Sequence, residues 1–196
     1  MPGRFDPELH KYYDNNDIEI PGVTATLAEA GLINTRYYNN FARDRGKAVA
    51  KAIELWLHGI LDDETVDMEV RPYLNYFIKF YNNSKFKAEL SLVEVPLIHP
   101  LLHFGGIPDL PGYLNDEPCV IDIKCGAKEP WHMIQLAYYS ILLRDIAGFP
   151  VKKRFALYLC GQGLVEYKNR GDEIMALSCL TVAQWKRREG IINANV

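Results

Sequence analysis

Two aspartates and a lysine stand out by their types and their spacing. Gly106-Ile-Pro-Asp109 is followed, thirteen residues after its aspartate, by the middle residue of Val120-Ile-Asp122-Ile-Lys124. Successive side chains of a strand point to opposite faces, so we expect Asp122 and Lys124 to share one face while the isoleucines face a core. Two carboxylates and an ammonium at one end of a hairpin suit a divalent cation that holds a phosphate and a water.

The apolar residues around Asp122 and Lys124 predict a buried strand, and charges on a buried strand cost free energy unless they are paired or bind a metal. One interpretation is a buried Asp–Lys ion pair beside a turn aspartate. The other is a magnesium site, in which Asp109, Asp122 and the backbone carbonyl of Ile123 supply oxygen ligands and the cation keeps several waters. Lys124 would then orient a water and offset negative charge on the phosphate.

Composition narrows the class of protein. The chain has 196 residues, of which 48% are hydrophobic, and a formal net charge of −3, which predicts a single domain over residues 1–196. A protein that binds nucleic acid by bulk charge would be basic, so such binding must come from a local patch or a bound metal. The four cysteines lack Cys-x-x-Cys spacing, and no apolar run approaches the ~20 residues of a membrane span. We therefore expect free thiols, a cytoplasmic location and no membrane partner.

Periodicity and turn residues predict the order of elements. Residues 1–20 are expected to form a loose arm with a short strand near Ile18–Ile20, and Thr26-Leu-Ala-Glu29 has the pattern of a capping box. The helical segments expected are 35–58, 66–82, 130–147 and 172–188. The strands expected are Leu90–Ile98, Leu102–Leu110, Cys119–Lys124, Arg154–Gly161 and Leu164–Tyr167. This order predicts an α/β fold with a central mixed sheet flanked by helices.

The helix expected after the lysine carries two polar residues on one face. Gln135 and Tyr139 are four apart, and residues at this spacing lie one turn above the other. They are either polar residues at the edge of the core or groups that touch a substrate.

Together, Gly106-x-x-Asp109, Asp122-Ile-Lys124 and Gln135-x-x-x-Tyr139 resemble the motif set of the PD-(D/E)XK nuclease superfamily. They most resemble its RecB-like branch, which includes phage-type exonucleases. The segments Pro21–Thr24, Gly31–Ile33 and Asp44–Glu54 are similar to the amino-terminal half of small phage members, so the likeness covers about residues 20–190.

The resemblance implies a restriction-endonuclease-like core and a Mg²⁺- or Mn²⁺-dependent deoxyribonuclease. Asp109, Asp122 and Lys124 would be catalytic, and Gln135 and Tyr139 would touch substrate beside Arg45 and Lys47. It further implies an exonuclease in phage DNA recombination, repair or end processing, in bacterial or phage-infected cytoplasm. Its partners would be DNA and a phage single-strand annealing or recombination protein, and a homo-oligomer is compatible with it.

One position departs from the resembled pattern. The RecB-like branch usually has a histidine four residues after Gly46, and this chain has Ala50 there. Glu54, one turn further along the expected helix, and Glu94 are the substitute carboxylates, each with an alternative as an ordinary surface charge. Ala50 also favours a second hypothesis, in which the chain is a catalytically weak or inactive nucleic-acid-binding or assembly protein.

Overall fold

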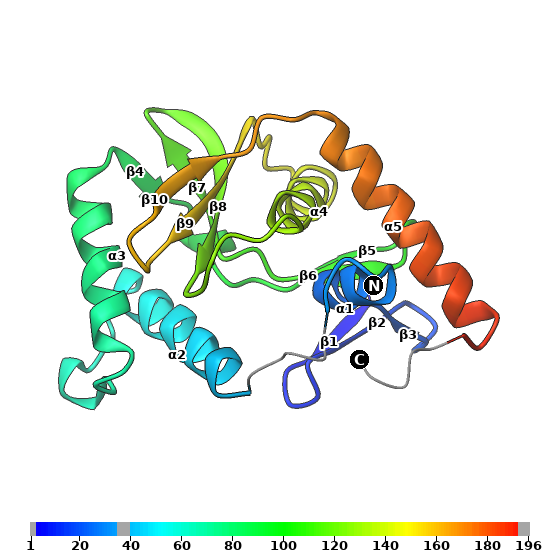
Figure 1. Ribbon diagram of the computed structural model, residues 1–196, viewed down its shortest axis with the longest axis horizontal. Helices are drawn as coiled ribbons and strands as arrows, with labels where there is room; N and C mark the ends of the chain where they lie inside the picture. The colour runs from blue at the N-terminus through cyan, green and yellow to red at the C-terminus, as the bar shows by residue number, and fades with distance from the viewer. Residues whose placement is uncertain (1–2, 35–39, 192–196) are drawn as a thin grey trace.

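The computed structural model describes residues 3–34 and 40–191 (Figure 1). The helices are α1 (Val23–Glu29), α2 (Asn40–Leu57), α3 (Arg71–Asn83), α4 (His132–Asp145) and α5 (Gly171–Arg188), with short 3₁₀ helices at η2 (Asp63–Thr65) and η3 (Leu90–Leu92). The strands are β1 (Arg4–Asp6), β2 (Lys11–Tyr13), β3 (Glu19–Ile20), β4 (Phe86–Ala88), β5 (Leu97–His99), β6 (Phe104–Gly106), β7 (Leu110–Leu114), β8 (Glu117–Lys124), β9 (Lys153–Tyr158) and β10 (Gly163–Glu166).

A five-stranded mixed sheet forms the centre of the molecule, in the order β10-β9-β8-β7-β4. Strands β8 and β9 are parallel, and α4 connects them, as a parallel pair requires. The other neighbouring pairs are antiparallel. The predicted fold class, α/β with a mixed sheet flanked by helices, is confirmed.

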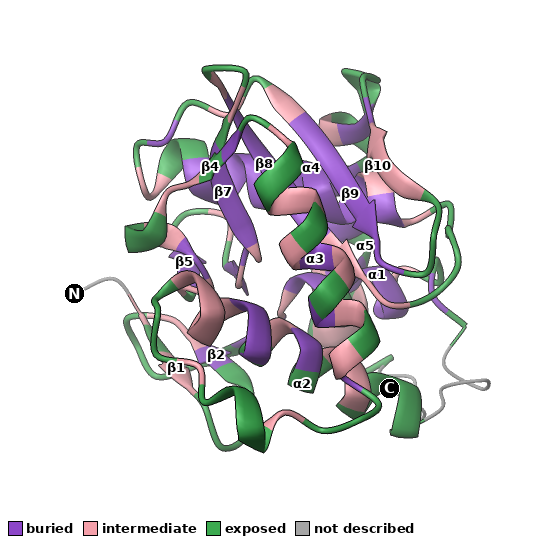
Figure 2. Cartoon of the chain, turned by 90° about the vertical axis from the view of Figure 1, so that its left-hand side faces the viewer, coloured by how far each residue is buried: buried purple, intermediate pink, exposed green. Residues whose placement is uncertain are grey.

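Helices cover both faces of this sheet. Figure 1 shows α2 and α3 on one side, and α4, seen almost along its axis, between the sheet and α5. Along β8, Ile121 packs in the core made with α2 and α3, whereas Val120 packs in the core made with α1, α4 and α5. The middle strands β7, β8 and β9 are accordingly buried over most of their length (Figure 2).

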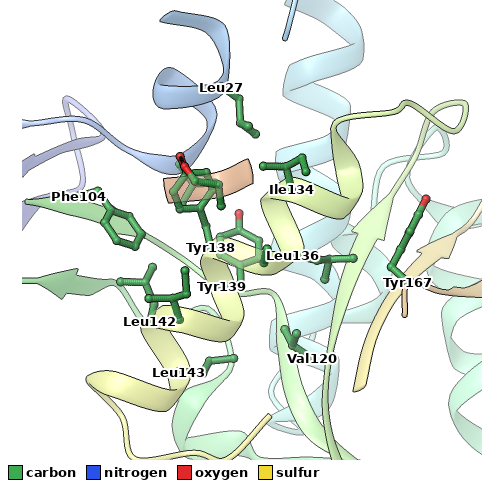
Figure 3. Packing of buried hydrophobic residues seen from close by; sticks show 14 of the residues in the cluster. Leu27, Phe104, Val120, Ile134, Leu136, Tyr138, Tyr139, Leu142, Leu143 and Tyr167 are labelled. Carbon is green, nitrogen blue, oxygen red and sulfur yellow. Dashed lines mark hydrogen bonds between the residues drawn. The ribbon is translucent and has the colours of Figure 1, made fainter. Parts of the chain in front are cut away.

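Helix α4 is buried on nearly every side, because the sheet, α1 and α5 all pack against it. Figure 3 shows Ile134 and Leu136 of α4 between Leu27 of α1 and Val120 of β8, with Leu142 and Leu143 further along the helix. Polar residues on such a helix must find partners inside the protein. Gln135 and Tyr139, on the part of α4 that faces the end of β8, meet this requirement through hydrogen bonds described below.

The amino-terminal segment is not a loose arm. Its described residues form a three-stranded antiparallel sheet, β1-β2-β3, which lies outside the central sheet. Tyr12 and Ile20 pack against Ile98 of β5, and the Tyr12 ring lies against Gly22 and Gly105. The short strand predicted near Ile18–Ile20 is confirmed as β3, but the loose arm was wrong. The contacts with Ile98 and Gly105 join residues 78 to 93 positions apart, and short polar strands carry no local signal for them.

Two predicted strands were also wrong. Leu90–Ile98 contains η3 and a turn at Glu94, whose positive φ of 53° is incompatible with an extended strand, before β5 begins at Leu97. Leu102–Leu110 is divided, because Ile107-Pro108 separates β6, which pairs with β5, from β7 in the central sheet. Strand β4 had not been predicted.

The turn between β7 and β8 is shorter than predicted. Pro111 and Gly112 lie within β7, and only Asn115 and Asp116 connect the strands, with φ of 52° and 63°. Two consecutive residues with positive φ match the preferred twist of a two-residue hairpin turn.

The predicted helices are largely confirmed, with differences at their ends. Residues 35–39 of the predicted helix 35–58 lie outside the described residues, and the segment 66–82 becomes helical only from Arg71. The capping box is wrong, because α1 already begins at Val23 and the Thr26 hydroxyl donates to the Gly22 carbonyl. Among the described helices, none combines the length and the apolar character that a membrane span needs.

Candidate metal-binding and catalytic site

The carboxyl end of β8 extends beyond its partner β7. The last pair of the antiparallel ladder is Leu110 with Ile121, so Asp122, Ile123 and Lys124 continue past it. Asp109, immediately before β7, closes this open edge: its Oδ2 accepts a hydrogen bond of 2.6 Å from the Ile123 N–H. The strand overhang therefore brings the two aspartates of the motif together.

The Ile123 carbonyl lies on the same edge as Asp109. The N–H and C=O of one strand residue point to the same neighbouring strand. Ile123 N–H points to Asp109, whereas the carbonyl of the next residue, Lys124, accepts from Leu159 N–H on the opposite edge at 2.9 Å. The sequence-based choice of this carbonyl as an oxygen ligand therefore agrees with the strand geometry.

Lys124 is held between β8 and α4. Its Nζ lies 2.6 Å from Asp122 Oδ2 and donates to Gln135 Oε1, also at 2.6 Å. The Nζ atom also lies 5.2 Å from the centre of the Trp131 ring, within reach of a cation–π interaction. Gln135 in turn donates through Nε2 to the Tyr139 hydroxyl at 3.0 Å, which fixes the orientation of its amide.

A cavity of about 410 Å³ contains this group of side chains. The cavity is bounded by α4 through Gln135 and Tyr139, and by α2 through Lys47 and Ala50. The acidic residues that line it are Glu94, Asp109 and Asp122, and Lys124 lines it as well.

Burial and mutual repulsion raise the pKa of the carboxyls in this cavity. The pKa of Asp109 lies well above its usual range because of burial, then Asp122 and Glu94, although Lys124 and the Ile123 N–H oppose the shift. Burial also raises the pKa of Asp122, against the attraction of Lys124. The pKa of Glu94 is raised to about 7 by burial, Glu54 and Asp122. Three acids that destabilise one another's charge form a place where a cation would be favoured.

Glu94 lies in this cavity, but it does not come from a strand as predicted. It sits in the turn after η3, and its N–H donates to the Pro108 carbonyl at 3.3 Å, which fastens the turn beside Asp109. Glu54 does not line the cavity and instead forms an ion pair of 2.8 Å with Lys51 on α2. Of the two substitute carboxylates, the structure places Glu94 beside the aspartates.

The two basic residues proposed for substrate contact lie in different places. Lys47 is exposed and lines the cavity. Arg45 lines a neighbouring hollow that also contains Lys124 and Trp131, and its guanidinium lies over the ring of Tyr73, 5.1 Å from the centroid.

Three aromatic side chains line the site without having been predicted. His10, just before β2, and Tyr12 of β2 line the cavity, and Trp131 borders Lys124. No sequence signal places His10 and Tyr12 there, because the β1-β2-β3 sheet had not been predicted. Trp131 follows Pro130 just before α4 and could have been found from that position alone.

Gly106 of the first motif has a packing role. A Cβ at this position would lie 2.8 Å from Val23, 2.9 Å from Leu142 and 3.2 Å from the Tyr139 ring. Contacts this short require the neighbours to move. Glycine therefore lets β6 approach α4 closely enough for Tyr139 to reach the cavity.

The residues present fit a divalent cation of the magnesium type. Asp122 is 1% exposed, and its Oδ2 lies 2.6 Å from the Lys124 ammonium. An ionised carboxylate has about four lone-pair sites, so this contact leaves it able to bind a cation as well. Among residues 3–34 and 40–191, no three His, Cys, Asp or Glu side chains are grouped closely enough to hold a metal by themselves. Two carboxylates suffice for Mg²⁺, which retains waters and binds substrate phosphate oxygens.

No protein-family model matches this chain, and no curated protein matches it. A solved structure, "Crystal structure of SSO0001", is similar over 88% of this chain and 76% of that chain, with a TM-score of 0.41 and 16% sequence identity. At this level the likeness carries no argument about function, which has to come from the site itself.

Proposed function

We propose that this protein is a Mg²⁺- or Mn²⁺-dependent nuclease that hydrolyses phosphodiester bonds of DNA. The observation that carries the proposal is the position of Lys124, whose Nζ lies 2.6 Å from Asp122 Oδ2 in the cavity that also contains Asp109. Acid and base residues at one strand end meet the needs of phosphodiester hydrolysis, which are charge neutralisation and an oriented water. The resemblance to PD-(D/E)XK nucleases, with a restriction-endonuclease-like core, supports the same conclusion.

Each residue has a definite task in this proposal. Asp109 and Asp122 would hold the cation, with the Ile123 carbonyl on the same strand edge. When bound, Mg²⁺ or Mn²⁺ supplies a Lewis acid that polarises the phosphate and lowers the pKa of a water. An ammonium has three N–H donors, and Asp122 and Gln135 account for two directions around Lys124. The third would orient the attacking water and stabilise charge on the phosphate.

The test is digestion of end-labelled linear, circular and single-stranded DNA with Mg²⁺, Mn²⁺ or chelator. We expect metal-dependent cleavage that falls at least about 100-fold in Lys124→Ala, the usual effect of removing a charge-stabilising group. Lys79→Ala is the matched control, because Lys79 is an exposed lysine on α3 outside the cavity. The same loss of activity in Lys79→Ala would mean that the effect of Lys124→Ala is not specific to the site, and this would contradict the proposal.

The finer function rests on the resemblance alone. We propose an exonuclease in phage-type recombination, repair or end processing, acting with a single-strand annealing or recombination protein. Loss of linear DNA with intact circles would support exonuclease action, whereas nicked circles would replace it with endonuclease action. Labelled RNA of the same sequence tests whether the substrate is DNA, because the groups in the cavity would contact the phosphate, which DNA and RNA share.

A specific observation favours a second candidate, a nucleic-acid-binding or assembly protein with weak or no catalysis. Ala50 lines the cavity at the position where the resembled branch has a histidine, and a methyl group cannot bind metal. DNA binding without cleavage under every metal condition would establish this candidate. Calorimetric titration with Mn²⁺ gives an independent measure, because the nuclease proposal requires binding that is lost in Asp122→Ala.

A further inference from the structure

A second cavity, of about 470 Å³, lies at the other end of β9 from the acidic site. It is bounded by the start of β9, the end of β10 and the connection from β10 into α5, which Figure 1 shows above α4. Lys124 pairs in register with Tyr158, and Arg154 lies four residues earlier on the same strand. Four residues of strand correspond to roughly 13 Å, so this is a separate site.

Basic side chains dominate this second cavity, in contrast to the first. Those that line it are Lys152, Lys153, Arg154, Lys168 and Arg170, and the acidic residues there are Glu166 and Glu173. The cations come from two segments that are separated in sequence by β10. Their convergence on one hollow gives a local positive field in a chain whose formal net charge is −3.

Part of this positive charge is not taken up in ion pairs among the described residues. Lys168 pairs with Glu166 at 3.2 Å, and Lys153 pairs with Glu117. Glu173 is engaged by Arg144 of α4 at 3.1 Å. Within the described residues, neither Lys152 nor Arg170 takes part in an ion pair, and both are exposed at the cavity.

Arg154 adds a buried charge to the cavity wall. It is 8% exposed, and its Nη2 donates to the Asn169 carbonyl at 2.5 Å and to Asp172 Oδ2 at 3.1 Å. Its Nη1 is buried and has no hydrogen-bond partner among the described residues. A guanidinium presents five N–H donors in a planar fork suited to phosphate oxygens, and the Asn169 carbonyl and the Asp172 carboxylate are both bound by Nη2 alone.

We propose that this cavity is a phosphate-binding site, distinct from the site of hydrolysis. Its volume falls within the range of small-ligand sites and is large enough for a nucleotide. The spread of cations around it matches a group with several charged oxygens better than a single carboxylate. The phosphate belongs either to a free nucleotide or to the backbone of a nucleic-acid strand, and both present the same chemistry to these residues.

Isothermal titration calorimetry in the presence of chelator tests the site. The chelator removes the divalent cation that the proposed hydrolysis needs, so no cleavage of the oligonucleotide is expected during the titration. The probes are inorganic pyrophosphate, ATP and a twelve-nucleotide oligothymidylate. We expect saturable binding of at least one probe, weakened at least tenfold in Lys152→Ala/Arg170→Ala. The matched control is Lys79→Ala/Lys85→Ala, which removes the same charge from exposed positions on α3 and just before β4 and should stay within twofold of the unmodified protein.

The outcomes separate the two sources of phosphate. Binding of pyrophosphate or ATP that depends on Lys152 and Arg170 identifies a free phosphate or nucleotide site. Binding of the oligonucleotide alone, with the same dependence, identifies a strand contact. The proposal is overturned if no probe binds, or if the control pair weakens binding as much as the cavity pair. Because metal is absent, failure here is independent of whether the protein cleaves DNA.

Discussion

At the scale of single residues, the position of Lys124 depends on one amide. Gln135 accepts from the lysine through Oε1 and donates to Tyr139 through Nε2, so its orientation is fixed from both ends. Burial, followed by Asp109 and Asp122, raises the pKa of Tyr139, which keeps the hydroxyl protonated at neutral pH. Gln135 is therefore a positioning residue, which acts on the reaction through the lysine.

Replacing this amide should reduce catalysis without removing the ammonium. In Gln135→Met we expect kcat to fall roughly 10- to 100-fold, the scale of a catalytic group displaced by about 1 Å. Tyr139→Phe removes only the hydroxyl that orients the amide, so it should cost less than Gln135→Met. Steady-state kinetics on labelled DNA, with circular dichroism to verify folding, measures both. Equal kcat in Gln135→Met and the unmodified protein would show that Lys124 needs no support from α4.

The residues of the site could be predicted where the signal was local. Asp122 and Lys124 follow from two-residue alternation on one strand, and Asp109 follows from its position before the preceding strand. Glu94 could be named only as a candidate, and on the wrong element, because its place in the cavity depends on a positive φ and a hydrogen bond to the Pro108 carbonyl. The pairing of Gln135 with Lys124 depends on how α4 packs on β8, which no spacing reveals.

At the scale of elements, the contact between β6 and α4 limits what the first motif tolerates. Gly106→Ala introduces a Cβ within 3 Å of Val23 and Leu142, on the face of α4 that carries Tyr139. We expect a loss of about 1–3 kcal/mol in the free energy of unfolding, the typical cost of overpacking. Denaturant unfolding followed by fluorescence measures it.

Gly126→Ala provides the matched comparison for that prediction. No atom lies within 4 Å of a Cβ built at Gly126, which follows β8 just after the site, so its effect should stay within about 1 kcal/mol. If the two alanine variants unfold at the same denaturant concentration, β6 and α4 are not packed as tightly as described.

The same scale explains why some elements could be predicted and others could not. Strand β8 and helix α4 could be predicted from their own sequences, because each contains a long apolar run with clear ends. The β1-β2-β3 sheet is stabilised from outside, by Tyr12 against Gly105 and by the bridge between Gly22 and Gly105. A bridge between two glycines that are far apart in the sequence produces no hydrophobic periodicity in either segment, so it could not be predicted.

At the scale of the whole molecule, charge is divided between two cavities. Three acidic and three basic side chains line the cavity at the carboxyl end of β8, whereas five basic and two acidic side chains line the one at the start of β9. Ionisation of the acidic group opposes folding, since each carboxyl is harder to ionise in the folded state than in the unfolded state. The free energy of unfolding should therefore fall as the pH rises and these carboxyls ionise.

Glu94 gives the clearest window for that dependence. Its pKa rises from an ordinary 4.5 to about 7 on folding, so its contribution to stability is complete below pH 4.5 and is lost as the pH rises through 7. Burial lowers the pKa of His132 to about 3. This shift reduces the stability of the fold only below pH 6.5, the ordinary pKa of a histidine, where the unfolded chain binds the proton more readily. Between pH 6.5 and 8 the carboxyls therefore dominate, and in chelator the Tm should fall across this range.

Thermal unfolding with and without Mn²⁺ tests this prediction together with the metal site. Glu94→Gln should flatten the fall in Tm between pH 6.5 and 8, whereas Glu64→Gln, at an exposed position in η2, should retain it. Mn²⁺ should raise the Tm more at pH 8 than at pH 6.5, because a cation offsets the ionised carboxyls and competes with fewer protons at the higher pH. A full pH slope in Glu94→Gln would remove Glu94 from the cluster of interacting acids. A Tm unchanged by Mn²⁺ at both pH values would mean that only protons relieve the repulsion among these carboxyls. This result would contradict the proposed metal-dependent activity.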